Sequence, residues 1–259
     1  MDTAQLGAQL KRWRGHRRLS QLDLALDAGV SARHLSFVET GRARPSRDLL
    51  LALAERLHMP LREQNALLVA AGFAPKFPEH DLSDARLAAG RAAVTQVLEA
   101  FKPNPALAVD SRWTLIEANG SALMLMSGVA PGLLVPPVNV LRLSLHPQGL
   151  APRILNLAQW RGSVFQRLNE QLDASADPEI AALLNELRGY PGGEASVSLA
   201  ESFVLPLRLA SDAGELAFIT MTTMFGTPLE VTLSEVAIET FLPADEVTAE
   251  RLRRLLPQA

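Results

Sequence analysis

Basic side chains gather in the first quarter of the 259-residue chain. Lys11, Arg12, Arg14, Arg17 and Arg18 all lie within the first eighteen residues. Residues 1–75 hold 11 Lys and Arg against 7 Asp and Glu, whereas the remainder holds 14 against 21. Such an asymmetry is typical of a basic module that meets an anionic partner, joined to an acidic module with another role. Taken alone, the charge run also fits a solvated helix face.

Residue types that carry catalysis or bind metals are thinly spread. Cysteine is absent, which excludes disulfides, thiolate nucleophiles and Cys-ligated zinc or iron–sulfur sites. The histidines stand at positions 16, 34, 58, 80 and 146, and no two are three or four residues apart. The sequence also lacks a G-x-S-x-G elbow, an H-E-x-x-H pair and a glycine-rich phosphate loop. We therefore expect no enzyme activity, no metal and no cofactor beyond a small effector.

Short helices must position the basic residues. Ser20 and Ser31 are suited to cap helices over 21–28 and 32–40, and Gly29 suits the left-handed turn between them. Apolar spacing and caps predict three further helices: one carrying Leu6, Leu10 and Trp13, one after Ser46, and one over 61–71. Two short helices joined by a glycine turn describe a helix-turn-helix.

The segment LSQLDLALDAGVSARHLSFVETGRARPS, residues 19–46, resembles the core of the Xre/phage-repressor family of helix-turn-helix proteins. The resemblance implies that helix 32–40 enters the major groove of a double-stranded DNA operator, where Arg can read guanine. It implies base contacts from Ala32, Arg33, Ser36 and Phe37, and phosphate contacts from Gln21, Arg42 and Arg44. Ser31 and Glu39 are interpreted as structural, and Phe37 has the alternative of packing on the protein.

The second module reads as an α+β layer. Prolines and charges at 74–81 mark a boundary, and an Ala-rich helix over 82–101 is expected to connect the modules or to pack between protomers. Strands are predicted at 106–110, 114–119, 203–210, 216–225 and 236–244, with residues 139–190 mostly helical. This order predicts a five-stranded antiparallel sheet with helices on one face. The domains are thus expected to be 1–74 (five-helix, DNA-binding), 75–101 (linker and connecting helix) and 102–259.

This order of elements is similar to a PAS domain, and the residues resemble the ligand-binding domain of MmyB-like transcription regulators. The segments that carry the resemblance are PALAVDSRWTLIEAN (105–119), NVLRLSLHPQGL (139–150), Trp160-Arg161, YPG (190–192), FVLPLRL (203–209) and TTMFGTPLEVTLSEVAIETFLPAD (222–245). The resemblance points to a small-molecule effector, a fatty acid or acyl compound, and the mean hydropathy of +0.11 suits an apolar one.

An effector pocket is expected between sheet and helices, mostly apolar with a few orienting polar groups. The candidate lining residues are Leu107, Val109, Leu115, Asn119, Leu123, Leu141, Leu145, Trp160, Val164, Phe218 and Thr222. Arg142, His146 and Arg161 are candidate donors to an effector carboxylate. Each of these residues also fits an ordinary role in core packing or at a helix end.

The sequence therefore predicts a cytoplasmic, homodimeric transcription regulator without a membrane segment, whose operator affinity responds to an effector. The alternative left open is a regulator whose C-terminal domain serves protein interaction or dimerisation and holds no small ligand. An enzyme fused to a DNA-binding domain is a further alternative, for which the sequence offers no cluster of ionisable groups.

Overall fold

The computed structural model describes residues 3–193, 205–226 and 230–255. The chain divides into two compact units. Unit 1 comprises Met1–Asp81 together with Pro228–Ser234, and unit 2 comprises Leu82–Thr227 together with Glu235–Ala259. The first unit is therefore assembled from two stretches of chain that lie far apart in sequence.

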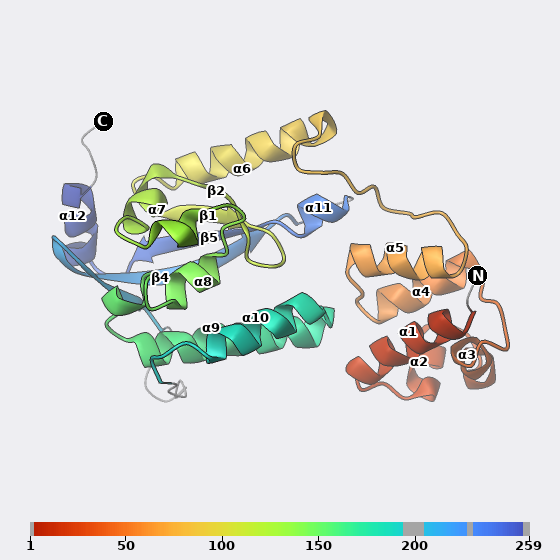
Figure 1. The fold of residues 1–259 in the computed structure, drawn as a ribbon. Coiled ribbons are helices and arrows are strands. Elements are labelled where there is room, and N and C mark those ends of the chain that lie inside the picture. The colour runs from red at the N-terminus through yellow and green to blue at the C-terminus, as the bar shows by residue number, and fades with distance from the viewer. Residues whose placement is uncertain (1–2, 194–204, 227–229, 256–259) are drawn as a thin grey trace. The chain divides into compact units, whose positions relative to one another are not determined.

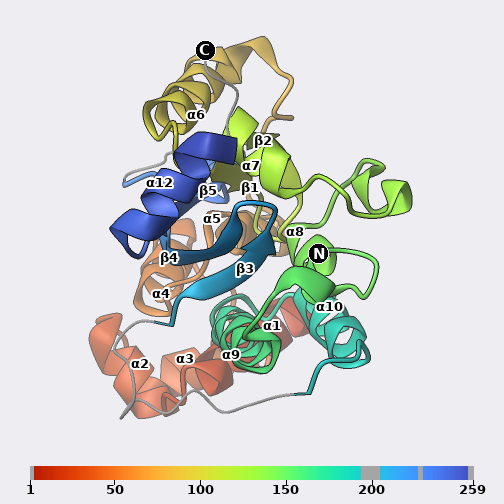
Figure 2. The same ribbon diagram turned by 90° about the vertical axis from the view of Figure 1, so that its left-hand side faces the viewer.

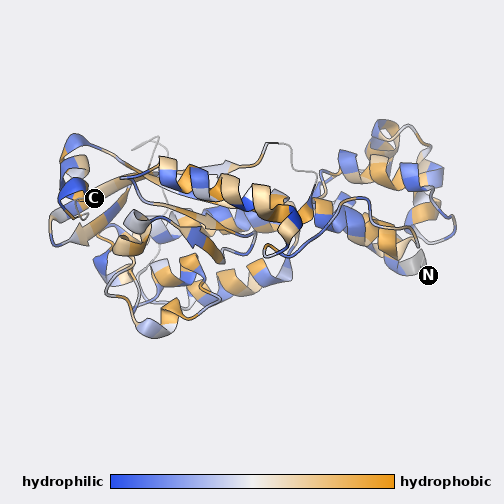
Figure 3. Cartoon of the chain, turned by 90° about the horizontal axis from the view of Figure 1, so that it is seen from above, coloured by the Kyte–Doolittle hydropathy of each residue, from blue (hydrophilic) through white to orange (hydrophobic). Residues whose placement is uncertain are grey.

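Unit 1 is helical around one apolar core. Its helices are α1 (Thr3–His16), α2 (Gln21–Asp27), α3 (Ala32–Glu39), α4 (Arg47–Arg56), α5 (Leu61–Ala70) and the short α11 (Val231–Ser234) (Figure 1). Apolar and polar residues alternate around these helices (Figure 3), and Leu10, Trp13, Leu24, Leu35 and Leu53 are buried together. Burial of one apolar stripe per helix stabilises elements that are each too short to persist alone.

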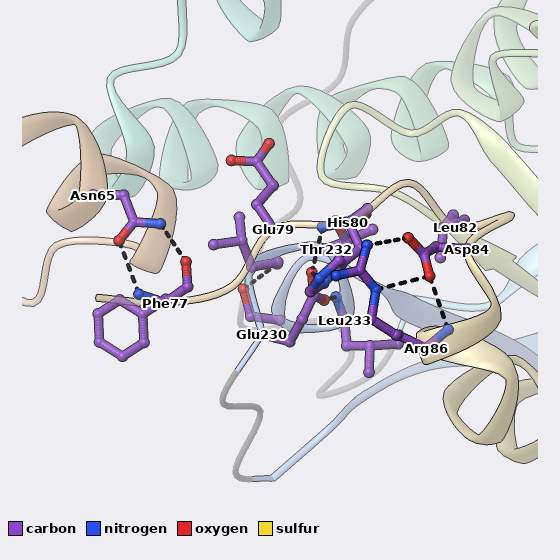
Figure 4. A network of polar contacts seen from close by, with 12 residues as sticks. Asn65, Phe77, Glu79, His80, Leu82, Asp84, Arg86, Glu230, Thr232 and Leu233 are labelled. Atoms are coloured by element: carbon purple, nitrogen blue, oxygen red, sulfur yellow. Dashed lines mark hydrogen bonds and ion pairs between the residues drawn. The ribbon is translucent and has the colours of Figure 1, made fainter. Parts of the chain in front are cut away.

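The expected linker residues 75–81 lie in unit 1, where polar contacts hold them (Figure 4). Asn65 of α5 accepts hydrogen bonds from the backbone N–H groups of Lys76 and Phe77 through Oδ1, and donates to the Phe77 carbonyl through Nδ2. The buried Asn65 amide thus holds residues 76–77 in place, although this irregular segment makes no regular backbone hydrogen bonds of its own.

The segment 230–234 is bound to the segment 75–81 by hydrogen bonds (Figure 4). The Val231 N–H donates to the Pro78 carbonyl at 2.9 Å, and the Thr232 hydroxyl donates to the His80 carbonyl at 2.6 Å. The His80 N–H donates to Oε1 of Glu230 at 2.9 Å. Val231 is fully buried. Both backbone and side-chain contacts thus make α11 part of unit 1, although the chain on either side of it belongs to unit 2.

Unit 2 is a five-stranded antiparallel sheet with the strand order β2-β1-β5-β4-β3, which confirms the predicted fold class. The strands are β1 (Ala106–Val109), β2 (Leu115–Ala118), β3 (Leu207–Ser211), β4 (Gly214–Met224) and β5 (Ala237–Pro243). The predicted first residues of β3, 203 and 204, lie outside the described residues.

Helices cover both faces of this sheet, so the expectation of helices on one face was wrong (Figure 1). One face packs on α6 (Ala88–Ala100), through Val94 and Leu98 against Ala106 and Ala108 of β1. The Ala-rich stretch was expected to connect the modules or to pack between protomers. In the structure its apolar stripe packs on the sheet, against the face of β1 to which Ala106 and Ala108 point.

The other face carries the larger core. It packs on α7 (Gly120–Leu125), α8 (Val140–Leu145), α9 (Leu157–Ser175) and α10 (Pro178–Arg188). Single 3₁₀ turns occur at Ala85–Leu87, Pro131–Leu134 and Ala151–Arg153. An additional helix, α12 (Glu246–Leu255), lies beside β4 (Figure 2) and buries Leu252 in the same core. In the second half of β4, Met221 and Met224 are exposed.

Candidate functional site

The helix-turn-helix is set by local capping. The Ser20 hydroxyl accepts from the Asp23 N–H while the Asp23 carboxylate accepts from the Ser20 N–H, which is a complete capping box on α2. Gly29 ends that helix at φ +68°, and the Ser31 hydroxyl accepts from the His34 N–H to start α3. The residue types predicted from the sequence thus fix the angle between α2 and α3.

A buried ion pair fixes α3 against α1 and α2. Arg14 donates to both oxygens of Glu39, Nε to Oε1 at 2.6 Å and Nη2 to Oε2 at 2.9 Å. Gln21 adds a bond from Nε2 to Oε2 at 2.7 Å. Burial raises the pKa of Glu39, but the bonds from Arg14 and Gln21 and the Arg14 charge outweigh it and leave the pKa below its ordinary value. Glu39 therefore holds the motif together as a carboxylate.

One exposed surface collects the remaining predicted DNA contacts. Arg33 is exposed on α3 and its guanidinium stacks over the Phe37 ring, with Cζ 5.4 Å from the centroid. The loop that follows folds back on α3, because the N–H groups of Arg42 and Ala43 both donate to the Phe37 carbonyl. This brings the exposed Arg42 and Arg44 next to the end of the helix, with Ala32 and Ser36 half-buried on it. Their contacts with bases and phosphates stay predictions.

The side chain of Gln21, a candidate phosphate contact, also makes a hydrogen bond within the protein. Its side-chain amide nitrogen is bound to Glu39, while the residue itself remains half-buried at the start of α2. A phosphate contact by this side chain stays a prediction, and it would have to use the amide N–H that Glu39 does not hold.

Unit 2 contains an apolar cavity of about 80 Å³ between the sheet and its helices. Its aliphatic wall comes from β1, α7, α8, α9 and β3, with Leu107, Leu125, Leu141, Val164 and Leu209 as representatives. A site for one water molecule needs only about 10–15 Å³ by a comparable measure. The cavity is therefore larger than an ordinary packing defect, and it has the apolar character of a ligand site.

Five polar or amphipathic side chains interrupt this apolar wall. The Trp160 indole Nε1 donates to the Ser144 hydroxyl at 3.0 Å. Arg167 lines the cavity beside Glu239, to which its Nη2 donates at 2.8 Å. Trp113, with φ +64°, donates from Nε1 to Oε1 of Gln171 at 2.8 Å, and its ring lies 4.7 Å from Cζ of Arg167.

The predicted pocket residues divide into two groups. Leu107, Leu141, Trp160 and Val164 line the cavity. The others lie elsewhere: Val109, Leu145 and Phe218 are buried in the surrounding core, Leu115 packs against that core, Leu123 is exposed, and Thr222 is bonded to Glu239. Asn119 caps α7 and bonds the backbone of Ala106, Leu98 and Asn104. Roles for all of them in ligand binding stay predictions.

The three predicted carboxylate donors do not line this cavity. Arg142 pairs with Glu186 on the surface, Nε to Oε1 at 2.8 Å, and Tyr190 donates to the same carboxylate. The hydrogen bond from Arg142 lowers the pKa of Glu186, while burial and the Glu186 bond raise the pKa of Tyr190 to about 12. His146 stacks edge-on against Tyr190. Arg161 is buried and donates to the Gly193 carbonyl at 2.8 Å.

Sequence reasoning missed Arg167 and Glu239. The sequence of β5 contained an indication of Glu239. This residue is two positions before Phe241, so both side chains point to the same face of the strand, and its neighbours are Ile238 and Thr240. A carboxylate on the covered face of a strand is costly unless it is paired, and so points to a buried partner. No local pattern in α9 identifies Arg167 as that partner.

Among the residues that the structure describes, no three His, Asp or Glu side chains gather as they would around a metal ion. Within the same ranges, no helix is long and apolar enough to cross a membrane.

Comparison with known families finds two matches. Residues 91–255 match the family described as MmyB-like transcription regulator ligand binding domain. Residues 5–67 match a helix-turn-helix domain. A comparison with curated proteins finds no match.

Two solved structures are similar in sequence to part of the chain. The restriction-modification controller protein C.AhdI from Aeromonas hydrophila is 32% identical, covering 24% of this chain and 96% of that protein, with a TM-score of 0.24. The clp gene regulator ClgR from Corynebacterium glutamicum is 26% identical, covering 39% of this chain and 94% of that one, with a TM-score of 0.24.

Proposed function

Because this chain belongs to the MmyB-like transcription regulator ligand-binding-domain family and carries a helix-turn-helix domain, we propose that it is an effector-controlled, operator-binding regulator. Unit 1 reads the operator through the exposed face of α3, and the following loop contacts phosphates. The cavity of unit 2 holds a small, largely apolar effector, either a fatty acid or an acyl derivative.

The observation that carries the proposal is the cavity itself. About 80 Å³ of space is walled almost entirely by aliphatic and aromatic side chains, yet two charged residues reach its edge. A filled core would have favoured a protein-interaction role for unit 2. An apolar body with one polar end matches this distribution of side chains.

Regulation follows from differential binding. An effector shifts operator affinity only to the extent that it binds one arrangement of the regulator better than another.

We propose a homodimer, because one helix-turn-helix buries little DNA surface and paired half-sites one helical turn apart are the usual solution.

The first experiment is denaturing extraction of the purified protein followed by mass spectrometry, paired with operator binding measured before and after effector removal. We expect a small acyl compound at about one per chain and an operator affinity that changes when it is added back. A clean extract and an operator affinity that no acyl compound alters would favour the protein-interaction alternative.

DNA recognition is tested separately by three arginine variants. Arg33→Ala should lose preference for the operator over random duplex, because it removes a candidate base contact worth about 1–3 kcal/mol. Arg42→Ala should weaken all duplexes alike and reduce the slope of log affinity against log salt by about 1. Arg56→Ala, an exposed arginine on α4, is the control and should change neither quantity. Unchanged discrimination by Arg33→Ala would place base reading elsewhere.

A further inference from the structure

We propose that the effector presents an uncharged hydrogen-bonding head, such as an amide, ester or alcohol, to the Arg167–Glu239 pair at the edge of the cavity. This inference rests on the proposed effector role of that cavity. It concerns which acyl compounds bind, and it favours neutral derivatives over the free acid.

The pair is already charge-balanced by its own members. Arg167 donates from Nη2 to Oε1 of Glu239 at 2.8 Å and from Nη1 to Oε2 at 3.3 Å. Thr222 ties the two together, since its hydroxyl donates to Oε1 of Glu239 at 2.6 Å and accepts from Nη2 of Arg167 at 3.0 Å. The Glu239 side chain is 5% exposed and that of Arg167 is 32% exposed. A buried carboxylate held in this way stays paired, because an isolated buried charge is costly.

A charged head would meet a like charge at this pair. A carboxylate drawn to Arg167 faces Glu239, and an ammonium drawn to Glu239 faces Arg167. Placing a like charge beside either member of this partly buried pair is unfavourable, whereas a neutral dipole carries no such penalty. The pair therefore discriminates against both signs of charge.

The pair still has hydrogen-bonding capacity for a neutral group. Arg167 makes three of the five hydrogen bonds its guanidinium can donate, and the other two N–H groups have no protein partner among the described residues. Within the described parts of the chain, Oε2 of Glu239 accepts only the 3.3 Å bond from Nη1 of Arg167. An amide fits this arrangement, with its carbonyl accepting from Arg167 and its N–H donating to Oε2.

A second neutral contact lies on the cavity wall. The Ser144 hydroxyl accepts from Trp160 Nε1, and its own hydrogen has no partner within the described ranges. A hydroxyl donor suits a carbonyl or ether oxygen of the ligand. The rest of the wall is apolar, so the ligand body is aliphatic.

The test compares three ligands with one chain length: octanamide, octanoate and octylammonium. Binding to the full-length protein at pH 7 is followed by calorimetry and by the fluorescence of Trp113 and Trp160, both of which line the cavity. We expect octanamide to bind about ten-fold or more tightly than either charged ligand.

Charge-neutralising variants separate this inference from simple hydrophobicity. Glu239→Gln leaves Arg167 without its counter-charge, so the affinity for octanoate should rise about ten-fold or more relative to the affinity for octanamide. Arg167→Gln should transfer the gain to octylammonium, and serves if Glu239→Gln does not fold. Glu186→Gln makes the same change beside the surface residue Arg142 and should alter none of the affinities.

Two outcomes would overturn the inference, and they are distinguishable. Tightest binding of octanoate to the unaltered protein, with no gain in Glu239→Gln, would show a site that accepts an acid, and the effector role of the cavity would stand. No binding of any of the three ligands by a protein that still binds DNA would remove the effector role and this inference with it.

Discussion

Glu39 joins three helices of the helix-turn-helix unit, because it lies on α3 and binds Arg14 of α1 and Gln21 of α2. It is buried at the end of α3 and accepts three hydrogen bonds from Arg14 and Gln21. Glu39→Gln keeps the size of the side chain but removes the charge. We expect it to destabilise unit 1 by about 2 kcal/mol at pH 7, as is typical for hydrogen bonds to a charged group.

The same residue predicts a pH dependence. The folded-state pKa of Glu39 lies below its ordinary value, so its stabilising contribution is fully present above the unfolded-state pKa. That contribution is lost as pH falls through the depressed folded-state pKa. The stability difference between wild type and Glu39→Gln should therefore shrink on acidification below about pH 4.

Urea unfolding followed by Trp13 fluorescence measures this difference, in a background where Trp113 and Trp160 are phenylalanine. Glu55→Gln, an exposed carboxylate on α4, is the control and should show no difference at any pH. A Glu39→Gln destabilisation that stayed constant down to pH 3 would contradict the assignment of a depressed pKa.

At the scale of elements, the packing of α1 on α3 depends on Gly7. A Cβ at this position would lie 2.2 Å from the Glu39 carbonyl oxygen, which is backbone and cannot move aside. A Cβ on Gly15 of the same helix would meet nothing within 4 Å. Gly7→Ala should therefore destabilise unit 1 by about 2 kcal/mol or more through overpacking, whereas Gly15→Ala should be neutral or stabilise it by about 0.5 kcal/mol.

Thermal unfolding of the two single variants, monitored by helical circular dichroism, tests the prediction, with Gly15→Ala on the same helix as the control. Equal melting temperatures for Gly7→Ala and Gly15→Ala would mean that α1 and α3 do not approach this closely in solution.

The elements differ in how far they could be predicted from sequence. Helices α2 and α3 were predictable because Ser20, Gly29 and Ser31 act through bonds within a few residues. The antiparallel sheet was predicted from the order of the elements, but the strand order was not, since pairing between β1 and β5 joins residues far apart along the chain. Helix α11 is four residues long and its partners lie about 150 residues earlier, so no local pattern predicts it.

Part of the apolar lining of the candidate site could be predicted from the sequence, but its charged pair could not. Apolar lining residues such as Leu107 and Val164 fall on predicted elements and line the cavity. The charged pair was not predicted, because joining Glu239 to Arg167 requires β5 to pack against α9. Arg142 and Arg161 occupy plausible helices, but their guanidinium groups bind Glu186 and the Gly193 carbonyl. Side-chain direction, rather than helix location, separates them from Arg167.

At the scale of the whole molecule, α11 gives unit 1 a component from the distant part of the chain. Val231 is fully buried, whereas Val247 of α12 is 53% exposed. Val231→Ala should weaken the attachment of α11 by about 1–3 kcal/mol, and Val247→Ala should have almost no effect. Hydrogen exchange of α5 amides, which contact α11, is the readout. Unchanged protection of α5 in Val231→Ala would show that α11 contributes no stability to unit 1.

The divided construction of unit 1 also bears on how such regulators can be recombined. The stretch 228–234 lies inside the sequence range matched by the ligand-binding family, yet it completes the DNA-binding unit. A gene fusion that joined residues 1–81 to a foreign sensor would leave this piece behind. Exchange at the linker would then deprive unit 1 of the contacts that Val231 and Thr232 make, unless the incoming sensor carries an equivalent insertion.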